Sequence, residues 1–373
     1  MPRPDVALVT PYPTLGRRHA GRSGVASYGC NLARSLSNAG ADVVVVAPRE
    51  ADGRELEDDQ GVTVLRSFDR GPRALLDAGR AVRDTGARLV HLQHETFLYG
   101  GPSSIAALPL ALRRMRTDGG GRRIAPVVTA HQVVARDSID RGFTQMHRVR
   151  VPARVARAGL GGVQATISRL AGAAIVHEPA FAPHLRDAVI VPHGIERVQS
   201  PPRDAARSRL GLSRRLVVLC FGYLAPYKGL EAALEAARRS NDTIELVVAG
   251  GEHPRLAGRD RYAAELEARF GDVARFTGYV AEADVPFWFA AADVALLPYP
   301  RPFSSSGALA LALAHGTPLL LSEQLARAVE SPRALATATD PATLAARLQT
   351  LRDPAALALL RTESAGLARG RSW

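Results

Sequence analysis

The 373-residue sequence has two cysteines, few aromatic residues and no long hydrophobic run. Cys30 and Cys220 lie in apolar surroundings, so we expect buried free thiols in a reducing compartment rather than a disulfide framework or zinc ligands. No apolar segment reaches the ~18–20 residues that span a bilayer, and the N-terminus lacks the segments of a signal peptide. These absences predict a cytoplasmic globular protein.

The charge is unbalanced, with 48 Lys and Arg residues against 36 Asp and Glu, a net charge of +12. Aromatic residues make up only 5% of the chain, which argues against a nucleic-acid partner, because such surfaces interleave rings with basic groups. The positive charge is densest at residues 112–123 and 147–157. These segments fit a solvated surface, or a face that meets an anionic substrate or the inner face of an anionic membrane.

Lysine is almost absent, and Lys228 is the only one in the chain. An ammonium is a compact point charge on a flexible stem, which a planar guanidinium does not replace. The sequence therefore predicts that Lys228 occupies a site that requires such a charge. The alternative is that this one lysine remains in the sequence by chance and has no special role.

Short runs rich in Val, Ile and Leu alternate with helical patterns in both halves of the chain, which predicts two parallel sheets covered by helices. Strands are expected at residues 6–10, 43–47, 89–92, 126–130, 174–176, 189–191, 216–221, 245–249, 274–276, 294–297 and 318–321. Helices are expected at 25–39, 72–85, 230–239, 261–270, 285–291, 308–315 and 354–369. We predict Rossmann-like domains at 1–197 and 204–353 around a cleft, joined by a proline-rich segment and followed by residues 354–373.

The segment FGYLAPYKG, residues 221–229, places a glycine at the end of a strand and Lys228 before a helix. A cation and free amide groups at a helix N-terminus suit a diphosphate. An ordinary turn with a solvent-facing lysine is the alternative interpretation.

Three serines and Gly307 precede the apolar helix expected at 308–315. A helix N-cap needs one hydroxyl, so the run Ser304–Ser306 offers more donors than a cap requires. We predict phosphate binding by Ser305, Ser306 and Gly307, with a simple cap as the alternative.

Residues 21–24, GRSG, follow the first strand and begin a helix at Gly24. They have the composition of an anion-binding loop or of a mobile interdomain loop. They do not form G-x-G-x-x-G, which disfavours an NAD-dependent dehydrogenase.

His131 ends a predicted strand and is therefore expected at the cleft, where a neutral imidazole donates to a sugar hydroxyl or to developing charge. A satisfied core histidine is the alternative. His94 and Glu95 follow another strand and are candidates for an acceptor pocket. Together with His91 they do not make a zinc site, because no third ligand follows at a suitable spacing.

Segments along nearly the whole chain resemble, in order and spacing, the family-4 retaining glycosyltransferases of the GT-B fold. They are GRSGVASYGCNLARSLSNAGADVVVVAP, PVVTAH, AAIVHEP, AVIVPHGIE, FGYLAPYKGLEAALEA, FTGYV, AADVALLPY and SSSGALALALAHGTPLLLS. The resemblance implies an acceptor-binding N-terminal domain, a nucleotide-sugar-binding C-terminal domain and a final helix that crosses back to the first domain.

The resemblance also implies roles for the candidate residues. Lys228 neutralises the departing diphosphate, and the backbone at Tyr279 and Val280 meets the nucleobase. His131 sits beside the donor sugar. Further donor contacts fall to Gly24, Gly222, Tyr223, Ser305, Ser306 and Gly307. No metal and no cofactor are implied, since the nucleotide-sugar is a substrate.

The chain departs from the family at two glutamates, which are replaced by Phe303 and Leu311, and at an arginine, which is replaced by Tyr223. We interpret these changes as marks of a serine-rich branch. A non-catalytic binding relative is the alternative, and the missing carboxylates motivate it.

The predicted activity is retaining transfer of a hexosyl group from a UDP- or GDP-sugar to a hydroxyl acceptor. Candidate acceptors are a glycolipid precursor, a sugar, a cyclitol or a secondary metabolite. A phosphorylase and a sugar-nucleotide epimerase share the fold and are the enzymatic alternatives. An epimerase is expected to carry additional carboxylates near the nucleotide, which the sequence does not show.

Overall fold

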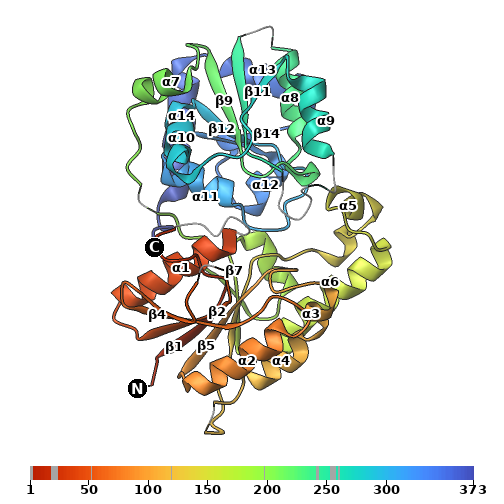
Figure 1. Cartoon of the computed structure of the whole chain (residues 1–373). Coiled ribbons are helices and arrows are strands. Elements are labelled where there is room, and N and C mark those ends of the chain that lie inside the picture. The colour runs from red at the N-terminus through yellow and green to blue at the C-terminus, as the bar shows by residue number, and fades with distance from the viewer. Residues whose placement is uncertain are drawn as a thin grey trace.

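The computed structural model describes residues 3–17, 24–51, 53–118, 120–196, 198–240, 243–252, 258 and 261–373. The chain forms two lobes, each built on one β-sheet with helices on its faces (Figure 1). The lobes lie one above the other, and the C-terminus lies at their junction.

The first lobe has an eight-stranded sheet in the order β3-β4-β2-β1-β5-β6-β7-β8. Its strands are β1 (Val6–Val9), β2 (Val43–Pro48), β3 (Leu56–Asp59), β4 (Val62–Phe68), β5 (Leu89–His94), β6 (Val127–Ala130), β7 (Ala173–Val176) and β8 (Ala188–Ile190). Its helices are α1 (Gly24–Asn38), α2 (Ala74–Thr85), α3 (Pro102–Ala106), α4 (Leu108–Arg114), α5 (Arg141–Met146) and α6 (Ala153–Leu170), with 3₁₀ helices η1 (Arg136–Ser138) and η2 (Pro179–His184). All pairs are parallel except β3 with β4.

The second lobe has a six-stranded parallel sheet in the order β11-β10-β9-β12-β13-β14. Its strands are β9 (Leu216–Phe221), β10 (Ile244–Ala249), β11 (Ala274–Phe276), β12 (Val294–Leu297), β13 (Leu319–Ser322) and β14 (Ala336–Thr337). Its helices are α7 (Arg203–Leu210), α8 (Leu230–Arg238), α9 (Tyr262–Phe270), α10 (Val285–Ala291), α11 (Gly307–Ala314), α12 (Glu323–Ala328), α13 (Pro341–Thr350) and α14 (Pro354–Ala368), with 3₁₀ helices η3 (Pro226–Lys228), η4 (Glu282–Asp284) and η5 (Arg333–Leu335).

The predicted architecture of two parallel α/β sheets is confirmed, and every strand and helix expected from the sequence is present. The sequence analysis missed β3, β4, β14, α3 to α7, α12 and α13. Strand β3 was missed because its inward-facing side chains are carboxylates, Glu57 and Asp59, instead of apolar groups. Both carboxylates are buried, so the apolar alternation that marks a strand is absent.

A buried ion pair holds this edge of the first sheet. The guanidinium of Arg66 on β4 is almost fully buried and donates to Glu57 Oε2 at 3.0 and 3.1 Å. The same group also donates to the carbonyl oxygens of Tyr12 and Pro13, at 3.2 and 2.8 Å. Arg66 therefore ties the β3–β4 hairpin to the loop that follows β1.

The connection between the lobes is held by the tail of the chain. Helix α14 packs against α11 and β13 of the second lobe. After it, the carbonyl of Arg371 accepts from Ile195 N–H at 2.6 Å, and Trp373 N–H donates to Ile195 O at 3.4 Å. The Trp373 ring then meets Tyr28 of α1, with ring centroids 4.9 Å apart. The segment after α14 thus bridges the connection and the first lobe.

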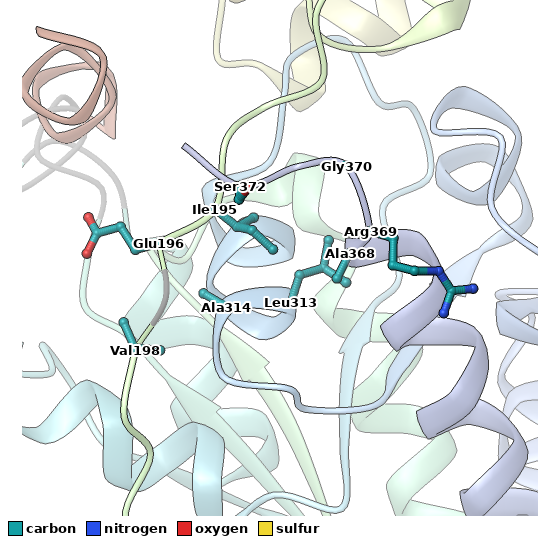
Figure 2. Close-up of a pocket in the computed structure, with 9 residues that line it drawn as sticks. All are labelled: Ile195, Glu196, Val198, Leu313, Ala314, Ala368, Arg369, Gly370 and Ser372. Atoms are coloured by element: carbon teal, nitrogen blue, oxygen red, sulfur yellow. The ribbon is translucent and has the colours of Figure 1, made fainter. Parts of the chain in front are cut away.

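A cavity of about 480 Å³ lies beside this bridge, between the interlobe connection, the end of α11 and the tail (Figure 2). Its lining residues are Ile195, Glu196, Val198, Leu313, Ala314, Ala368, Arg369, Gly370 and Ser372. Within it, the side chains of Glu196 and Arg369 lie on opposite sides. Beside the cavity, the backbone of Ile195 pairs with Ser372 of the tail, and Ser200 Oγ of the connection lies 3.0 Å from His315 Nδ1 at the end of α11. No helix among the described residues is long and apolar enough to cross a bilayer.

We predict that Arg66→Met lowers the free energy of unfolding by about 3–5 kcal/mol, because it leaves Glu57 buried without its partner. Chemical denaturation measures this change. The matched control is Arg80→Met, which breaks the exposed Arg80–Asp77 pair and is expected to cost no more than about 0.5 kcal/mol. Equal losses in the two variants would contradict the assignment of a structural role to Arg66.

Candidate glycosyl-transfer site

The carboxyl ends of the two sheets face each other across the junction of the lobes. Helix α11 of the upper lobe lies above α1 of the lower lobe (Figure 1), and α12 of the upper lobe contacts η2 of the lower lobe. His131 follows β6 in one lobe, and Ser305 precedes α11 in the other. The amide N–H of Ser305 donates to the carbonyl of His131 at 3.2 Å, so the loops at the two edges are in contact.

Lys228 lies in this region as a buried cation. Its ammonium donates to the carbonyl of Phe221 at 3.1 Å and lies 5.9 Å from the centroid of the Tyr299 ring. No carboxylate lies within ion-pair distance of it among the described residues. Burial lowers the pKa of Lys228 to about 8, because desolvation disfavours the charged form. The site thus holds an ammonium that lacks an anionic partner.

Glycine at position 222 makes room for this ammonium. Its φ of +100° lies in the region that favours glycine, and a Cβ there would lie 2.6 Å from Lys228 Nζ. A Cβ at residue 222 would therefore force the end of the lysine side chain to shift, and the positive φ would strain the backbone.

The other predicted donor-binding residues flank this loop at the same sheet edge. Leu224 N–H donates to Gly251 O at 2.9 Å, which joins the loops that follow β9 and β10. Gly251 in turn packs against the backbone of Tyr279, whose side chain is 67% exposed. Burial and the neighbouring Tyr279 raise the pKa of Tyr223. Val280 packs against the core of the lobe. Tyr279 thus presents an exposed ring at this edge.

The serine run before α11 has divided roles. The hydroxyl of Ser306 accepts from Leu309 N–H at 3.2 Å, which is an N-cap, and the amide of Ser305 is used by His131. The Ser305 hydroxyl is buried and has no hydrogen-bond partner within the part of the chain that the structure describes. The first turn of α11 leaves the amides of Gly307 and Ala308 as donors, since the first amides of a helix have no intrahelical acceptor.

Phe303 stands where the resembling family carries a glutamate, and here it joins the lobes. Its carbonyl accepts from Val133 N–H at 3.0 Å, and its ring lies 4.1 Å from that of His147 by centroids. The Phe143 ring meets it edge-on at 5.9 Å. Nearby, Arg301 donates to Asp140 at 2.8 Å. We call this interlobe contact the Phe303 clasp.

His131 is a neutral imidazole whose N–H is already used. Its Nε2 donates to Gln93 Oε1 at 2.8 Å, and Gln93 Nε2 donates to His91 Nε2 at 3.1 Å. Burial and the neighbouring imidazoles hold the pKa of His131 well below its usual value. The remaining ring nitrogen, Nδ1, therefore carries a lone pair. His131 can therefore accept, but not donate, a hydrogen bond at this atom.

The predicted acceptor-side pair is tied to the same strand ends. His94 is buried, which lowers the pKa of its imidazole to about 4. The backbone carbonyl of His94 accepts a hydrogen bond from the backbone amide of His131 at 2.9 Å. Glu95 Oε1 accepts from Gln132 Nε2 at 2.9 Å, and Gln132 pairs with Ser304 of the second lobe. Gly24 begins α1, but residues 21–23 of the expected glycine loop lie outside the described residues.

The sequence analysis missed a group of rings beside His131. Tyr28 has four neighbouring rings with centroids within 5.0 Å, those of His131, His177, His193 and Trp373. The histidines follow β6, β7 and β8. Their positions after consecutive parallel strands were the available signal, because the carboxyl ends of such strands meet at one edge.

Comparison with known proteins fits this arrangement. Residues 215–353 match the family described as "Glycosyl transferases group 1". Residues 215–353 therefore carry a glycosyltransferase family domain. It is 29% identical over 274 residues to the GDP-mannose-dependent alpha-(1-6)-phosphatidylinositol monomannoside mannosyltransferase of Mycolicibacterium smegmatis, an alignment that covers 69% of this chain and 64% of that protein.

Solved structures share the whole GT-B architecture. Sucrose-phosphate synthase from Thermosynechococcus elongatus superposes with a TM-score of 0.75 at 20% identity, covering 99% of this chain and 95% of that one. HepE of Anabaena in complex with UDP-glucose gives a TM-score of 0.69 at 16% identity, covering 98% and 94%. At 20% and 16% sequence identity, this similarity shows a shared fold.

We predict that Gly222→Ala displaces the Lys228 ammonium, because the new methyl group would occupy its place and the positive φ strains any side chain. Any anion held by this ammonium is expected to bind at least tenfold more weakly. Titration calorimetry with inorganic pyrophosphate measures the change. Gly211→Ala is the matched control, since Gly211 also has a positive φ but open space at its Cβ position. Unchanged pyrophosphate affinity in Gly222→Ala would contradict the packing argument.

Proposed function

We propose that this glycosyltransferase moves a hexosyl group from a UDP- or GDP-sugar to a hydroxyl acceptor with retention of anomeric configuration. The observation that carries the proposal is the buried ammonium of Lys228, which follows β9 of the second lobe, next to Tyr227, whose ring stacks on His147 of the first lobe. We assign the nucleotide donor to residues 204–353 and the acceptor to residues 1–197.

The charge of the departing diphosphate has partners in the second lobe. Lys228 supplies a cation in a desolvated site, where its attraction for an anion exceeds its value in water. The N-terminus of α11 adds its dipole and the amides of Gly307 and Ala308. We propose that these groups stabilise the leaving diphosphate without a bound metal ion.

The candidate bases of the first lobe are weakly basic or already hydrogen-bonded. This supports a retaining reaction in which the departing phosphate deprotonates the acceptor hydroxyl. His131 holds a lone pair but has a pKa far below neutral, so it is a poor proton acceptor. Glu95 is engaged by Gln132. A departing phosphate oxygen on the same face of the sugar is the remaining base for the acceptor hydroxyl. The new bond then forms on the face from which the diphosphate leaves.

The nucleobase is assigned to the backbone at Tyr279 and Val280, beside the exposed Tyr279 ring. The curated relative is GDP-mannose-dependent by name, and the Anabaena structures contain UDP or UDP-glucose. Both bases therefore stay within the proposal, and a thermal-shift screen of UDP, GDP, ADP and dTDP ranks them. A ligand at about 100 times its Kd adds about 2.7 kcal/mol of stability.

A lipid-linked acceptor is supported by the surface around α5 and α6. Arg150 and Arg154 are exposed there, beside Val151 and Val155, which are 42% and 49% exposed. Basic groups interspersed with exposed apolar side chains suit the surface of an anionic membrane. The mycobacterial relative is named for a phosphatidylinositol monomannoside acceptor. We propose that this surface, the α5–α6 patch, rests on the membrane while the acceptor is glycosylated.

We predict that Lys228→Met slows the release of UDP or GDP from its nucleotide-sugar about a hundredfold, because the departing diphosphate loses its cation. A coupled nucleotide-release assay measures the rate. Arg239→Met, which removes an exposed charge from the same lobe, is the control and should leave the rate unchanged. Donor that binds the native protein without any turnover would instead favour a non-catalytic relative.

The pKa of Lys228 predicts how nucleotide affinity depends on pH. The ammonium is present below about pH 8 and is lost above it, so the affinity for the nucleoside diphosphate is expected to fall as the pH rises through 8. The decline approaches tenfold per pH unit where only the charged form binds. Calorimetry between pH 6.5 and 9.5 measures it, and Lys228→Met should abolish the dependence. A flat profile in the native protein would contradict the assignment.

We predict that Arg150→Gln combined with Arg154→Gln weakens binding to phosphatidylserine-containing vesicles about thirtyfold, at about 1 kcal/mol per basic residue. Vesicle co-sedimentation at low ionic strength measures the partitioning. The control combines Arg352→Gln with Arg361→Gln, two exposed arginines of the second lobe. Equal loss in both double variants would indicate a general effect of net charge and count against the α5–α6 patch.

A further inference from the structure

The turn that carries Lys228 is in contact with the first lobe. Lys228 ends the 3₁₀ helix η3, and Tyr227 directly precedes it. The ring of Tyr227 stacks on that of His147, with an interplanar angle of 25° and ring centroids 5.4 Å apart. His147 follows α5 of the first lobe. One stacked ring pair thus joins the first lobe to the residue before the buried ammonium.

The second lobe fixes the other end of this turn. Gly229 follows Lys228 with a φ of +64°, and a Cβ there would lie 2.3 Å from the carbonyl oxygen of Pro298. The chain after Lys228 is therefore packed closely against the backbone that follows β12, in a conformation that favours glycine. On its other side, the position of the turn depends on what Tyr227 contacts. The lysine thus lies between a residue fixed by its own lobe and one that the first lobe holds.

His147 is itself held at the junction of the lobes. Its ring centroid lies 4.3 Å from that of Phe143 in the first lobe and 4.1 Å from that of Phe303 in the second. The ring of Tyr227 meets that of Phe303 edge-on, with centroids 5.9 Å apart. His147 and Tyr227 therefore pack against each other and against Phe303. Because these rings come from different lobes, their contact exists only while the lobes are together.

Helix α5 is anchored by the second lobe at its other end as well. Asp140 is the N-cap of α5, and its Oδ1 accepts from Phe143 N–H at 2.7 Å. The same oxygen accepts from Arg301 of the second lobe at 2.8 Å, and this guanidinium lowers the pKa of Asp140. A helix of six residues is marginal by itself, so its position depends on such contacts. The second lobe therefore holds α5 at both ends, and α5 in turn places His147 against Tyr227.

The groups that face the Lys228 ammonium are neutral, so burial decides its charge. The ring of Tyr299, after β12, lies 5.9 Å from the ammonium, and Cys220 of β9 is a nearby thiol. Burial raises the pKa of Tyr299, and it raises that of Cys220 to about 12. Neither group supplies a negative charge at neutral pH. A change in the access of water to Lys228 is therefore expected to change its pKa directly.

We propose that His147 positions Lys228 by stacking on Tyr227, so that the first lobe orders the diphosphate-binding cation when the lobes close. This inference rests on the proposed transfer and adds a positioning residue to its site. In an open arrangement the two rings separate, and the turn is then held on one side only. The diphosphate of the donor is thus bound strongly in the same arrangement that brings the first lobe into place.

The first measurement follows the ε-carbon NMR signal of Lys228 in the free full-length chain, labelled with ¹³C-lysine, as the pH rises. The midpoint near pH 8 is expected to rise to about 9 or above in His147→Ala, because the ammonium gains access to water. His147→Phe keeps a ring that stacks on Tyr227 and should restore the native midpoint. His184→Ala, which removes an exposed imidazole from the same lobe, is the matched control and should leave the midpoint unchanged.

A second variant keeps the test decisive where His147→Ala fails to fold. Tyr227→Leu removes the partner ring from the second lobe and should raise the Lys228 midpoint in the same way. The two changes combined complete a double-mutant cycle, with the affinities for GDP and UDP measured by calorimetry. Each single variant is expected to bind at least tenfold more weakly at neutral pH, because binding then includes the cost of ordering the turn. The double variant should lose no more than about twofold further. Thermal unfolding checks that each variant is folded.

The pH profile separates positioning from a purely structural role. In His147→Ala the pH above which nucleotide affinity declines should move upward with the Lys228 midpoint, since the ammonium stays charged to a higher pH. A contact that only stabilises the fold would lower the affinity without moving this pH.

The inference is overturned if the Lys228 midpoint is unchanged in the folded His147→Ala and Tyr227→Leu variants. It is also overturned if His147→Phe behaves like His147→Ala, or if the effects of the two single variants on affinity add in full. The NMR measurement uses the free protein. Failure of the native protein to bind GDP or UDP therefore overturns the proposed transfer, while the Lys228 midpoints still decide whether His147 positions the lysine.

Discussion

The ammonium of Lys228 against the carbonyl of Phe221 is the interaction on which the site depends. It places a positive charge in a desolvated position with only a neutral hydrogen-bond partner, and the fold is arranged around it. Residue 222 lacks a side chain so that the ammonium fits, and the loops after β9 and β10 are joined beside it. A desolvated cation without a counter-ion costs free energy, which a bound anion returns. In the proposed function, the protein thereby stores part of the binding energy for a diphosphate.

The two lobes meet at the same place, which connects domain closure to chemistry. The Phe303 clasp joins the loop before α11 to the first lobe. The hydrogen bond from Ser305 N–H to His131 O joins the same loop to the end of β6. The tail makes a second bridge, where Trp373 packs on Tyr28 and Tyr28 packs on His131. Both bridges therefore reach His131, the residue that we propose faces the sugar. A glutamate at position 303 would be a poor substitute for this clasp, because the ring packs in an apolar cluster around Ile139 and Phe143.

The sequence was sufficient for the architecture, because apolar strands and helices of regular length alternate in both halves. The single lysine was a compositional signal for Lys228, and the structure shows that its side chain is buried instead of facing solvent. The sequence did not reveal the role of Ser305, whose amide serves the interlobe contact, or the direction of the His131 hydrogen bond, which depends on Gln93. Such features arise from which loops tertiary packing brings together. The histidines around Tyr28 are also brought together by tertiary packing, although their positions after consecutive parallel strands were a signal that the sequence carried.

The measurement that tests the central claim most directly is an NMR titration of the one lysine side chain in protein labelled with ¹³C-lysine, which gives a single ε-carbon signal. The account predicts a midpoint near pH 8 in the free protein, because the ammonium is buried without an anionic partner. It predicts a higher midpoint once UDP or GDP is bound, since a neighbouring diphosphate favours the charged form. A midpoint near the ordinary lysine value of about 10.5, unchanged by either nucleotide, would show that Lys228 faces solvent and would contradict the account.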